Sequence, residues 1–342
     1  MSLLQVIRAD GILTVQDLGR PGHIAQGLSR GGAMDRLALI EAAALLGRNT
    51  VQAGIEMAGA GGVFTVDQPM RVALTGAPMT ATLDGAPLGW QASHRIEPGQ
   101  SLRIGGAQSG AYSYLTPAGG IATPDWLGSR AAHLTIGIGA VLKAGARLPA
   151  GADPDPDAPS RTIAVANRFA GGTVRIIDGP QTAIFSDEVL AKFAATEFTR
   201  AAHGNRQGVR LDAESRFTAG QTGIASDMVQ PGDLQMIGDG VPYVLLAECQ
   251  TMGGYPRIGT VIPTDLPLIA QAPPGARIRF LRIGLDQADG LYWDETQLLR
   301  ETASRCRNLV RDPAQMADLL SYQLVGGVTR GDELEETECR SI

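Results

Sequence analysis

A block near the middle of this chain occurs twice. The first copy spans residues 98–120 and the second spans residues 231–254, and each begins with Pro-Gly and ends with Gly-Gly. A further landmark, Gly-Ala-Arg-Leu at 145–148, recurs as Gly-Ala-Arg-Ile at 275–278. Landmarks in the same order at an offset of about 130 residues indicate an internal duplication. Two related halves are therefore expected, and a cleft between them is the first place to look for a functional site.

Turn-forming residues and short β-patterned runs dominate the sequence. Of its 342 residues, 44 are glycine and 20 are proline, without a collagen-like period, and 44% are hydrophobic, enough for one or two full cores. Turn pairs such as Asp84-Gly85 and Asp178-Gly179 separate the runs. This pattern predicts a mostly β protein of barrels or sandwiches. The expected strands are 3–7, 62–66, 71–75, 101–104, 111–116, 173–177, 243–247 and 277–283.

Helical patterns are few. A helix is predicted from Arg36 to Leu46 with Asp35 as its N-cap, and another from Ser186 to Phe193, whose first turn carries two acids. The tail is predicted to hold helices over 295–309 and 313–322 and to end in an acidic run, 332–338, with a role in packing or oligomerisation. Residues 150–159, rich in proline and aspartate, oppose both helix and sheet and are expected to link the halves.

Composition excludes several classes of function. The net charge of -6 and the lack of a basic run weigh against nucleic acid as a partner. Neither lysine, Lys143 or Lys192, stands in a Gly-x-x-x-x-Gly-Lys-Ser/Thr sequence, so an ATP site of the P-loop type is excluded. Histidine pairs at metal-ligand spacing are lacking, and Cys249, Cys306 and Cys339 form neither a disulfide framework nor a zinc pattern, so no metal site is expected. Without a leader pattern or about 18 consecutive apolar residues, the expected location is cytoplasmic, with no membrane partner.

Two glycine-rich loops carry polar side chains that can touch a ligand. In the first, Asp17, Arg20 and Asp35 stand among glycines that allow close backbone approach. Asp17 and Arg20 can equally form an ion pair that fixes the loop, and Asp35 can act as a helix cap alone. In the second, Ser129 and Arg130 offer a hydroxyl and a guanidinium to a carboxylate or phosphate. Tight turn packing explains the glycines of this loop as well.

The densest polar segment follows the apolar run of the second copy. Gln250, Thr251 and Tyr255 supply donors and acceptors where a strand is expected to pass into a loop. The corresponding segment of the first copy, residues 116–120, lacks this polar set. One copy is therefore predicted to have specialised for chemistry. Cys249 has no recognisable base partner and is expected to be a structural thiol.

A set of short motifs runs in order between residue 3 and about residue 282. These motifs closely resemble the allophanate hydrolase subunit 2 family, which includes the C subunit of the bacterial ATP-dependent 5-oxoprolinase, the second half of the urea carboxylase carboxyltransferase domain, and the antagonist of a sporulation kinase inhibitor. The matching motifs are Asp17-Leu18-Gly19-Arg20-Pro21-Gly22, Gly31-Gly32-Ala33-Met34-Asp35, Leu74-Thr75-Gly76-Ala77, Gly119-Gly120-Ile121, Leu127-Gly128-Ser129-Arg130, Gly179-Pro180-Gln181, Asn205-Arg206-Gln207-Gly208-Val209-Arg210-Leu211, Gln250-Thr251-Met252-Gly253-Gly254-Tyr255-Pro256 and Asp265-Leu266.

The resemblance implies a domain organisation and a partner. It implies tandem cyclophilin-like β-barrels, in agreement with the repeat. Combined with the linker and tail patterns, this predicts a mostly β chain with a few helices: a first barrel over 1–150, a linker over 151–170, a second barrel over 171–283 and, beyond the matching motifs, a helical C-terminal extension over 284–342. It also implies a subunit 1 protein, or B-type subunit, as partner, with the active site at or near their contact, and leaves room for a third, hydrolytic subunit. A homo-oligomer is also compatible with it.

The activity implied by the resemblance is that of an enzyme subunit acting on a small amide. In the 5-oxoprolinase version, ATP bound through the complex activates the amide oxygen of 5-oxoproline, and hydrolysis gives glutamate. The catalytic residues expected on this basis are Arg130, Gln250 and Tyr255. The substrate-binding residues expected are Asp17, Arg20, Asp35, Ser129, Arg206, Gln235 and Thr251.

Two other functions stay open at the level of sequence. One is biotin-dependent carboxyl transfer. The chain has no Met-Lys-Met attachment motif, so the biotin would have to be carried by another protein. The second is a non-catalytic role, in which the chain binds a partner protein and regulates it. A free-standing subunit without fused biotin domains favours 5-oxoprolinase. The chain departs from the family pattern at several positions, which bear on the identity of the substrate more than on the fold: Glu248 replaces a usual Asp, Gln207 a common Met, 226–228 a usual Ser-Glu-Gly, and 131–132 a frequent Ser-Thr.

Overall fold

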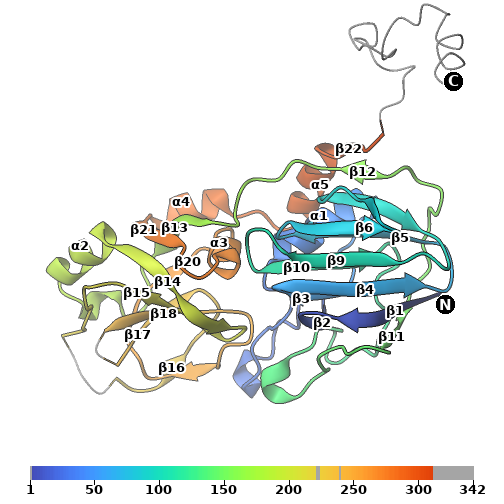
Figure 1. Ribbon diagram of the computed structural model, residues 1–342. Helices are drawn as coiled ribbons and strands as arrows, with labels where there is room; N and C mark the ends of the chain where they lie inside the picture. The colour runs from blue at the N-terminus through green and yellow to red at the C-terminus, as the bar shows by residue number, and fades with distance from the viewer. Residues whose placement is uncertain (1, 221–223, 239, 311–342) are drawn as a thin grey trace, which may run out of the picture. The chain divides into compact units, whose positions relative to one another are not determined.

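A computed structural model describes residues 2–220, 224–238 and 240–310 (Figure 1). The described residues up to Leu309 form one compact unit built mostly of strands, which confirms the predicted mostly β class. The predicted helix 313–322, the acidic run 332–338 and Cys339 lie outside the described residues. Within the described ranges, no helix has the length and apolar character needed to cross a membrane.

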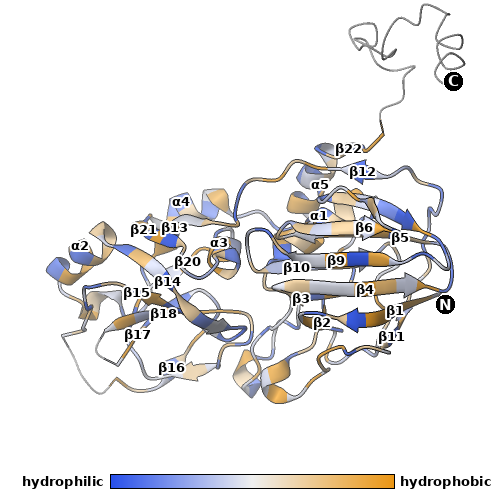
Figure 2. Cartoon of the chain, in the orientation of Figure 1, coloured by the Kyte–Doolittle hydropathy of each residue, from blue (hydrophilic) through white to orange (hydrophobic). Residues whose placement is uncertain are grey.

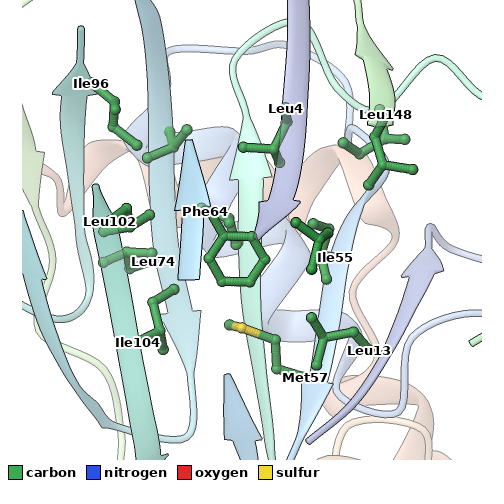
Figure 3. Close-up of a cluster of buried hydrophobic side chains, with 14 of the residues drawn as sticks. Leu4, Leu13, Ile55, Met57, Phe64, Leu74, Ile96, Leu102, Ile104 and Leu148 are labelled. Atoms are coloured by element: carbon green, nitrogen blue, oxygen red, sulfur yellow. The ribbon is translucent and has the colours of Figure 1, made fainter. Parts of the chain in front are cut away.

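The first half pairs its strands into two antiparallel sheets. One has the order β11 (Arg147–Ala150), β1 (Ser2–Ala9), β4 (Ala60–Val66), β9 (Leu102–Ala107), β6 (Met79–Leu83) and β7 (Ala86–Pro87). The other has the order β2 (Ile12–Gln16), β3 (Gly54–Ala58), β10 (Tyr112–Pro117), β5 (Met70–Gly76), β8 (Ala92–Ile96), β12 (Arg161–Thr162) and β22 (Arg307–Asn308). Apolar side chains from both sheets meet in a shared core around Phe64 (Figure 3).

The second half closes into a seven-stranded barrel. Its order is β13 (Gly171–Ile177), β20 (Arg257–Val261), β17 (Asp233–Ile237), β18 (Val241–Leu245), β15 (Gly208–Asp212), β14 (Glu197–Asn205) and β21 (Arg277–Arg282). A two-stranded sheet, β16 (Asp227–Met228) with β19 (Met252–Gly253), lies beside it. Four phenylalanine rings pack in the barrel core in stacked, edge-to-face and tilted pairs: Phe193, Phe198, Phe217 and Phe280. Aromatic pairs of this kind add stability beyond their buried area.

The duplicated block has the same local structure in both copies. Gly99 and Gly232 of the two Pro-Gly pairs adopt left-handed backbone angles, φ 87° and 99°, which glycine reaches without strain. A strand follows each turn, β9 from Leu102 in the first copy and β17 from Asp233 in the second. The pairing then diverges, because β17 forms a hairpin with β18 whereas β9 and β10 join different sheets.

The helices confirm two predictions and correct a third. α1 (Arg36–Leu45) is capped by Asp35 and packs its mostly buried length on β5 and α5, and α2 (Asp187–Ala195) is capped by Ser186. In Figure 2 α2 carries both blue and orange residues, as expected of a helix with one buried face. The predicted helix 295–309 is too long, because α5 ends at Ser304 and the chain turns into β22.

The remaining helices are α3 (Leu266–Gln271), α4 (Leu285–Leu291) and α5 (Glu295–Ser304). Three short 3-10 turns are η1 (Ile24–Gln26), η2 (Leu134–Ile136) and η3 (Thr182–Ile184).

The predicted linker is fastened to the first half. Asp153 receives two hydrogen bonds from the buried Arg71, at 2.8 and 2.9 Å from Nε and Nη2. β12 then joins the sheet beside β8, and Ile163 is buried in a small cluster with Leu46 and Ala73. The segment therefore runs along the surface of the first half before it enters the second.

A cluster of buried charges binds the end of the linker to the first half and is contacted by the second half through Gln271. Arg168 donates to Asp35 at 2.7 Å and to both oxygens of Glu41 at 2.9 and 2.8 Å, and all three residues are buried. Gln271 of α3 also donates to Asp35, and its side-chain oxygen accepts from the backbone amides of Ala111 and Tyr112. Asp35 is thus both a helix cap and a contact between halves, which accounts for its presence without a ligand.

Replacement of Arg168 tests this junction. Arg168→Met leaves the carboxylates of Asp35 and Glu41 buried without their cation, so the free energy of unfolding should fall by about 3–5 kcal/mol. Arg279→Met is the matched control, because Arg279 pairs with Glu197 on the exposed surface and should cost under about 1 kcal/mol. Urea unfolding followed by fluorescence measures both. Equal losses for the two variants would contradict the assignment.

Candidate functional site between the two halves

A cavity of about 470 Å³ lies where the two halves meet. The first half contributes one face of a sheet and the turn η2, and the second half contributes the turn between β14 and β15 together with Glu248. The lining residues are Ile12, Thr14, Glu56, Ala58, Tyr112, Leu134, Thr135, Gly204, Asn205, Arg206, Gln207 and Glu248. The expectation of a functional cleft between the duplicated halves thus corresponds to a real cavity.

Strand register explains the wall from the first half. Ala58 of β3 pairs with Ile12 of β2 and with Tyr112 of β10. Two residues along, Glu56 pairs with Thr14 in the same way. Cross-strand partners and residues two apart share one face of a sheet, so these five side chains form a continuous surface.

A tight turn presents Arg206 from the second half. The side-chain oxygen of Asn205 accepts from the backbone amides of Gln207 and Gly208, at 2.8 and 3.3 Å, which is the geometry that makes asparagine a turn former. The turn is also bound to the segment after β18, because Glu248 N donates to Arg206 O at 2.8 Å and Leu246 N to Gln207 O at 2.9 Å. Arg206 and Glu248 are therefore held side by side by backbone alone.

Arg206 connects the halves through two carboxylates. Its Nη1 donates to Glu56 of the first half, its Nε to Glu248 of the second, and its Nη2 to the carbonyl oxygen of Gly32 at 2.6 Å. Burial alone would lower the pKa of Arg206, but the two carboxylates outweigh burial and raise it. The guanidinium is thus a permanent cation held between two acids.

Each carboxylate has a second set of partners. Glu56 accepts from Met34 N at 2.8 Å and from the hydroxyl of Tyr114 at 2.7 Å. Glu248 accepts from the amide and the hydroxyl of Thr135, at 3.1 and 3.0 Å. Burial acts to raise the pKa of Glu248, but Arg206 and Thr135 stabilise the anion and hold this pKa below its usual value. Glu248 is therefore ionised at neutral pH.

His133 lies behind Glu248. Its Nε2 is 2.9 Å from the hydroxyl of Ser29, and its Nδ1 is 3.7 Å from Glu248 and has no hydrogen-bond partner among the described residues. Burial lowers the pKa of His133, so the ring is neutral at pH 7. Ser29 is also buried, so this serine-histidine contact supports the wall of the cavity rather than offering a nucleophile.

The cavity offers mixed donors and acceptors beside an apolar surface. Burial raises the pKa of Tyr112 to about 12, so its phenol remains a neutral donor at physiological pH. Thr14, Asn205 and Gln207 add neutral polar groups, while Ile12 supplies apolar contact. Such a set can hold a small polar ring in one orientation. Within the described ranges, no three His, Cys, Asp or Glu side chains are grouped so that they could hold a metal ion.

The first group of predicted site residues forms a loop-fixing network apart from this cavity. Asp17 accepts from the hydroxyl of Ser129 at 2.6 Å and from the backbone amide of Arg130 at 2.7 Å. Arg20 is fully buried and donates to the carbonyls of Ala131 and Trp126, at 2.5 and 3.3 Å, so it forms no ion pair with Asp17 in the described structure. Arg130 is exposed, with Asp125 at 3.6 Å.

The second group lies on the barrel. Gln250 donates to Gln235 at 3.2 Å, and Thr251 is buried with its carbonyl bound to Val229 N. Tyr255 is 51% exposed and borders a smaller cavity of about 260 Å³. Burial raises the pKa of Cys249 to about 12, as expected for a structural thiol. Of all the predicted site residues, Arg206 alone lines the larger cavity.

The sequence reasoning missed Glu56, Tyr112, Thr135 and Asn205 as lining residues. Glu56 carried a usable signal, because it is a single charge inside the otherwise apolar strand Gly-Ile-Glu-Met-Ala and such charges are buried only when paired. Thr135 and Tyr112 carried none, because their role depends on strand register and on the approach of the other half.

Comparison with known proteins assigns the chain to a family. The carboxyltransferase domain family, subdomains A and B, matches residues 26–282. The chain belongs to this family. It is 32% identical over 312 residues to the 5-oxoprolinase C subunit of Escherichia coli strain K12, a match that covers 90% of this chain and 99% of the relative. It is 30% identical over 290 residues to the 5-oxoprolinase C subunit of Haemophilus influenzae Rd, covering 84% and 93%.

A solved structure agrees on the fold. The crystal structure of the K. lactis urea amidolyase superposes with a TM-score of 0.79 at 21% identity over 88% of this chain. The match covers 20% of the length of the urea amidolyase chain. At this identity the similarity establishes the arrangement of strands and no more.

The pH dependence of stability tests the Arg206 cluster. Glu248→Gln should lower the free energy of unfolding by about 1.5–3 kcal/mol at pH 7, because it weakens charged hydrogen bonds. A carboxylate whose pKa is depressed on folding stabilises above its unfolded pKa of about 4.3, and this contribution is lost as pH falls through the folded pKa. The difference between wild type and variant should therefore hold from pH 7 to 5 and shrink below about pH 4.

Urea unfolding at several pH values measures this difference. Both proteins carry His133→Asn, because Glu248 lies 3.7 Å from His133 and acts to raise its pKa, so Glu248→Gln would otherwise also change the histidine's own contribution to stability below about pH 6.5. A difference that grows as the solution is acidified would contradict the ionised state of Glu248.

Proposed function

We propose that this chain is the C-type subunit of an ATP-dependent 5-oxoprolinase. With a B-type partner and a further hydrolytic subunit, it converts 5-oxoproline, water and ATP into glutamate, ADP and phosphate. The observation that carries the proposal is the near full-length similarity to relatives named as the C subunit of 5-oxoprolinase, including 99% of the Escherichia coli protein. We place the substrate in the cavity between the halves.

The chemistry of the cavity suits a small lactam. Its volume of about 470 Å³ falls within the range of about 300–1,000 Å³ typical of ligand sites. A lactam presents one N–H and one C=O on a compact ring. Thr14, Tyr112, Asn205 and Gln207 offer donors and acceptors for these groups, while Ile12 and Ala58 face the methylene carbons. In this proposal the chain binds and orients the amide.

The same cavity does not suit a nucleotide triphosphate. Its lining carries the two carboxylates Glu56 and Glu248, and the single lining cation, Arg206, is already hydrogen-bonded to both. A triphosphate requires several free cations or a run of backbone amides. We therefore propose that ATP, which activates the amide oxygen when bound, is held by another subunit of the complex.

Carboxyl transfer is a second candidate, favoured by the description of the family as a carboxyltransferase domain. Here carboxybiotin would arrive on another protein and meet an amide nitrogen at the same cavity. Dependence on bicarbonate and inhibition by avidin would support this reading. A purely regulatory role would give stable association with the partner and no turnover with 5-oxoproline, urea or related amides.

A matched pair of tyrosine variants tests where the substrate lies. The chain is purified with its partner subunits, and ATP turnover and glutamate formation are measured with 5-oxoproline. Tyr112→Phe keeps the ring but removes a donor from the cavity, so KM for 5-oxoproline should rise about threefold to tenfold. Tyr255→Phe removes an exposed hydroxyl on the barrel and should leave KM and kcat unchanged.

The reverse pattern would move the site to the loop that contains Gln250. Unchanged kinetics in Tyr112→Phe with a loss in Tyr255→Phe would contradict the placement of substrate between the halves. No 5-oxoproline-dependent turnover by the wild-type complex would contradict the proposed activity itself.

A further inference from the structure

Arg200 is a buried arginine without an acidic partner among the described residues. The residue is 8% exposed, and its Nη1 donates to the carbonyls of Ala201 and Ala202, at 2.7 and 3.2 Å. Its Nε is buried and has no hydrogen-bond partner in the described ranges, and Nη2 makes no hydrogen bond to them either. Arg168 and Arg206, by contrast, each contact two carboxylates. Arg200 therefore has guanidinium donors left for a ligand.

The guanidinium lies directly behind the wall of the cavity. The register of β14 and β15 shifts between Arg200 and Gly204, and such irregularities re-aim side chains near functional sites. A Cβ atom added at Gly204, which lines the cavity, would lie 2.7 Å from Arg200 Nη2. The absence of a side chain at Gly204 thus lets the guanidinium of Arg200 lie against the backbone of this lining residue.

The net charge of the cavity lining favours a role for Arg200 in binding an anionic ligand. The lining carries two carboxylates and one guanidinium, so a negatively charged substrate would meet a surplus of negative charge. Burial lowers the pKa of Arg200, and Tyr112 is the one neighbouring group that acts to raise it among the described residues. A buried charge without a counter-ion is costly, and a bound carboxylate would remove this cost.

Arg20 offers a useful contrast. It also lacks a carboxylate at ion-pair distance in the described structure, but it is fully buried and donates to the carbonyls of Ala131 and Trp126 in a loop apart from the cavity. Arg200 differs because it is next to two lining residues, Gly204 and Tyr112, and keeps some exposure. The two buried arginines therefore have different roles: Arg20 fixes a loop, and Arg200 lies next to the cavity.

We propose that Arg200 binds the carboxylate of the lactam substrate through its free guanidinium donors, and that glycine at position 204 allows the guanidinium to approach the cavity closely enough to do so. The planar fork of arginine matches the two oxygens of a carboxylate. This inference rests on the proposed function, because it names the residue that recognises one group of the 5-oxoproline molecule.

The test compares two ligands that differ by one carboxylate. 5-Oxoproline is the substrate, and 2-pyrrolidinone, the same ring without the carboxylate, serves as a competitive inhibitor of the purified complex. Arg200→Met should raise KM for 5-oxoproline about 30-fold or more while Ki for 2-pyrrolidinone stays the same. Arg200→Lys should recover part of this loss, because it keeps the charge but not the fork.

Two further variants complete the design. Arg210→Met, on the neighbouring strand, removes an exposed arginine that pairs with Asp212 and should leave both constants unchanged. Gly204→Ala should displace the guanidinium and raise KM for 5-oxoproline, which keeps the proposal testable if Arg200→Met does not fold. An equal loss for both ligands, or an unchanged KM in Arg200→Met, would overturn the proposal. So would a rise in KM for ATP alone, which would assign Arg200 to a phosphate.

Calorimetric titration without ATP separates this proposal from the activity. Both ligands are titrated into the wild-type and Arg200→Met complexes. Tighter binding of 5-oxoproline than of 2-pyrrolidinone, lost in the variant, supports the carboxylate site even if the complex does not turn 5-oxoproline over. Equal binding of the two ligands by the wild type overturns it even if turnover is observed.

Discussion

The structure of the site depends on one guanidinium, that of Arg206, held between Glu56 of the first half and Glu248 of the second. The first half cannot bury Glu56 alone, because an unpaired buried charge is costly, and the second half supplies Arg206, which is already paired with Glu248. Joining the halves satisfies both acids with one cation, and the Gly32 carbonyl and the Thr135 hydroxyl complete the hydrogen bonds. The pairing thus fixes the wall of the cavity and the contact between halves in a single cluster.

Two clusters of buried charge with different roles hold the halves together. The Arg168 cluster is closed, because Asp35 and Glu41 occupy the guanidinium and Gln271 completes the hydrogen bonds of Asp35. The Arg206 cluster opens on the cavity, where Glu248 and its neighbours line the surface. Arg200 is a third case, buried but not neutralised within the described part of the chain. The contrast between closed and open charge clusters separates residues that maintain the fold from those available to a ligand.

The sequence predicts the architecture well because its signals are local. Pro-Gly turns, alternating strands and the caps Asp35 and Ser186 are set by neighbouring residues, and the structure has them where expected. The site is predicted less well because it is assembled from distant segments. Glu56 and Arg206 are 150 residues apart, and nothing near either one specifies the other. The glycine-rich polar loop around Asp17 resembles a ligand-binding loop in the sequence. In the structure the Asp17 carboxylate accepts hydrogen bonds from the backbone amides of Gly19 and Arg130.

The most direct test is a crystal structure of the chain with its partner subunits and 5-oxoproline. The account predicts ligand density in the cavity between the halves, with the lactam beside Tyr112 and Asn205 and its carboxylate toward Arg200. Density at the loop of Gln250 and Tyr255 instead, with the cavity occupied by solvent alone, would contradict the central claim that the joined halves create the binding site.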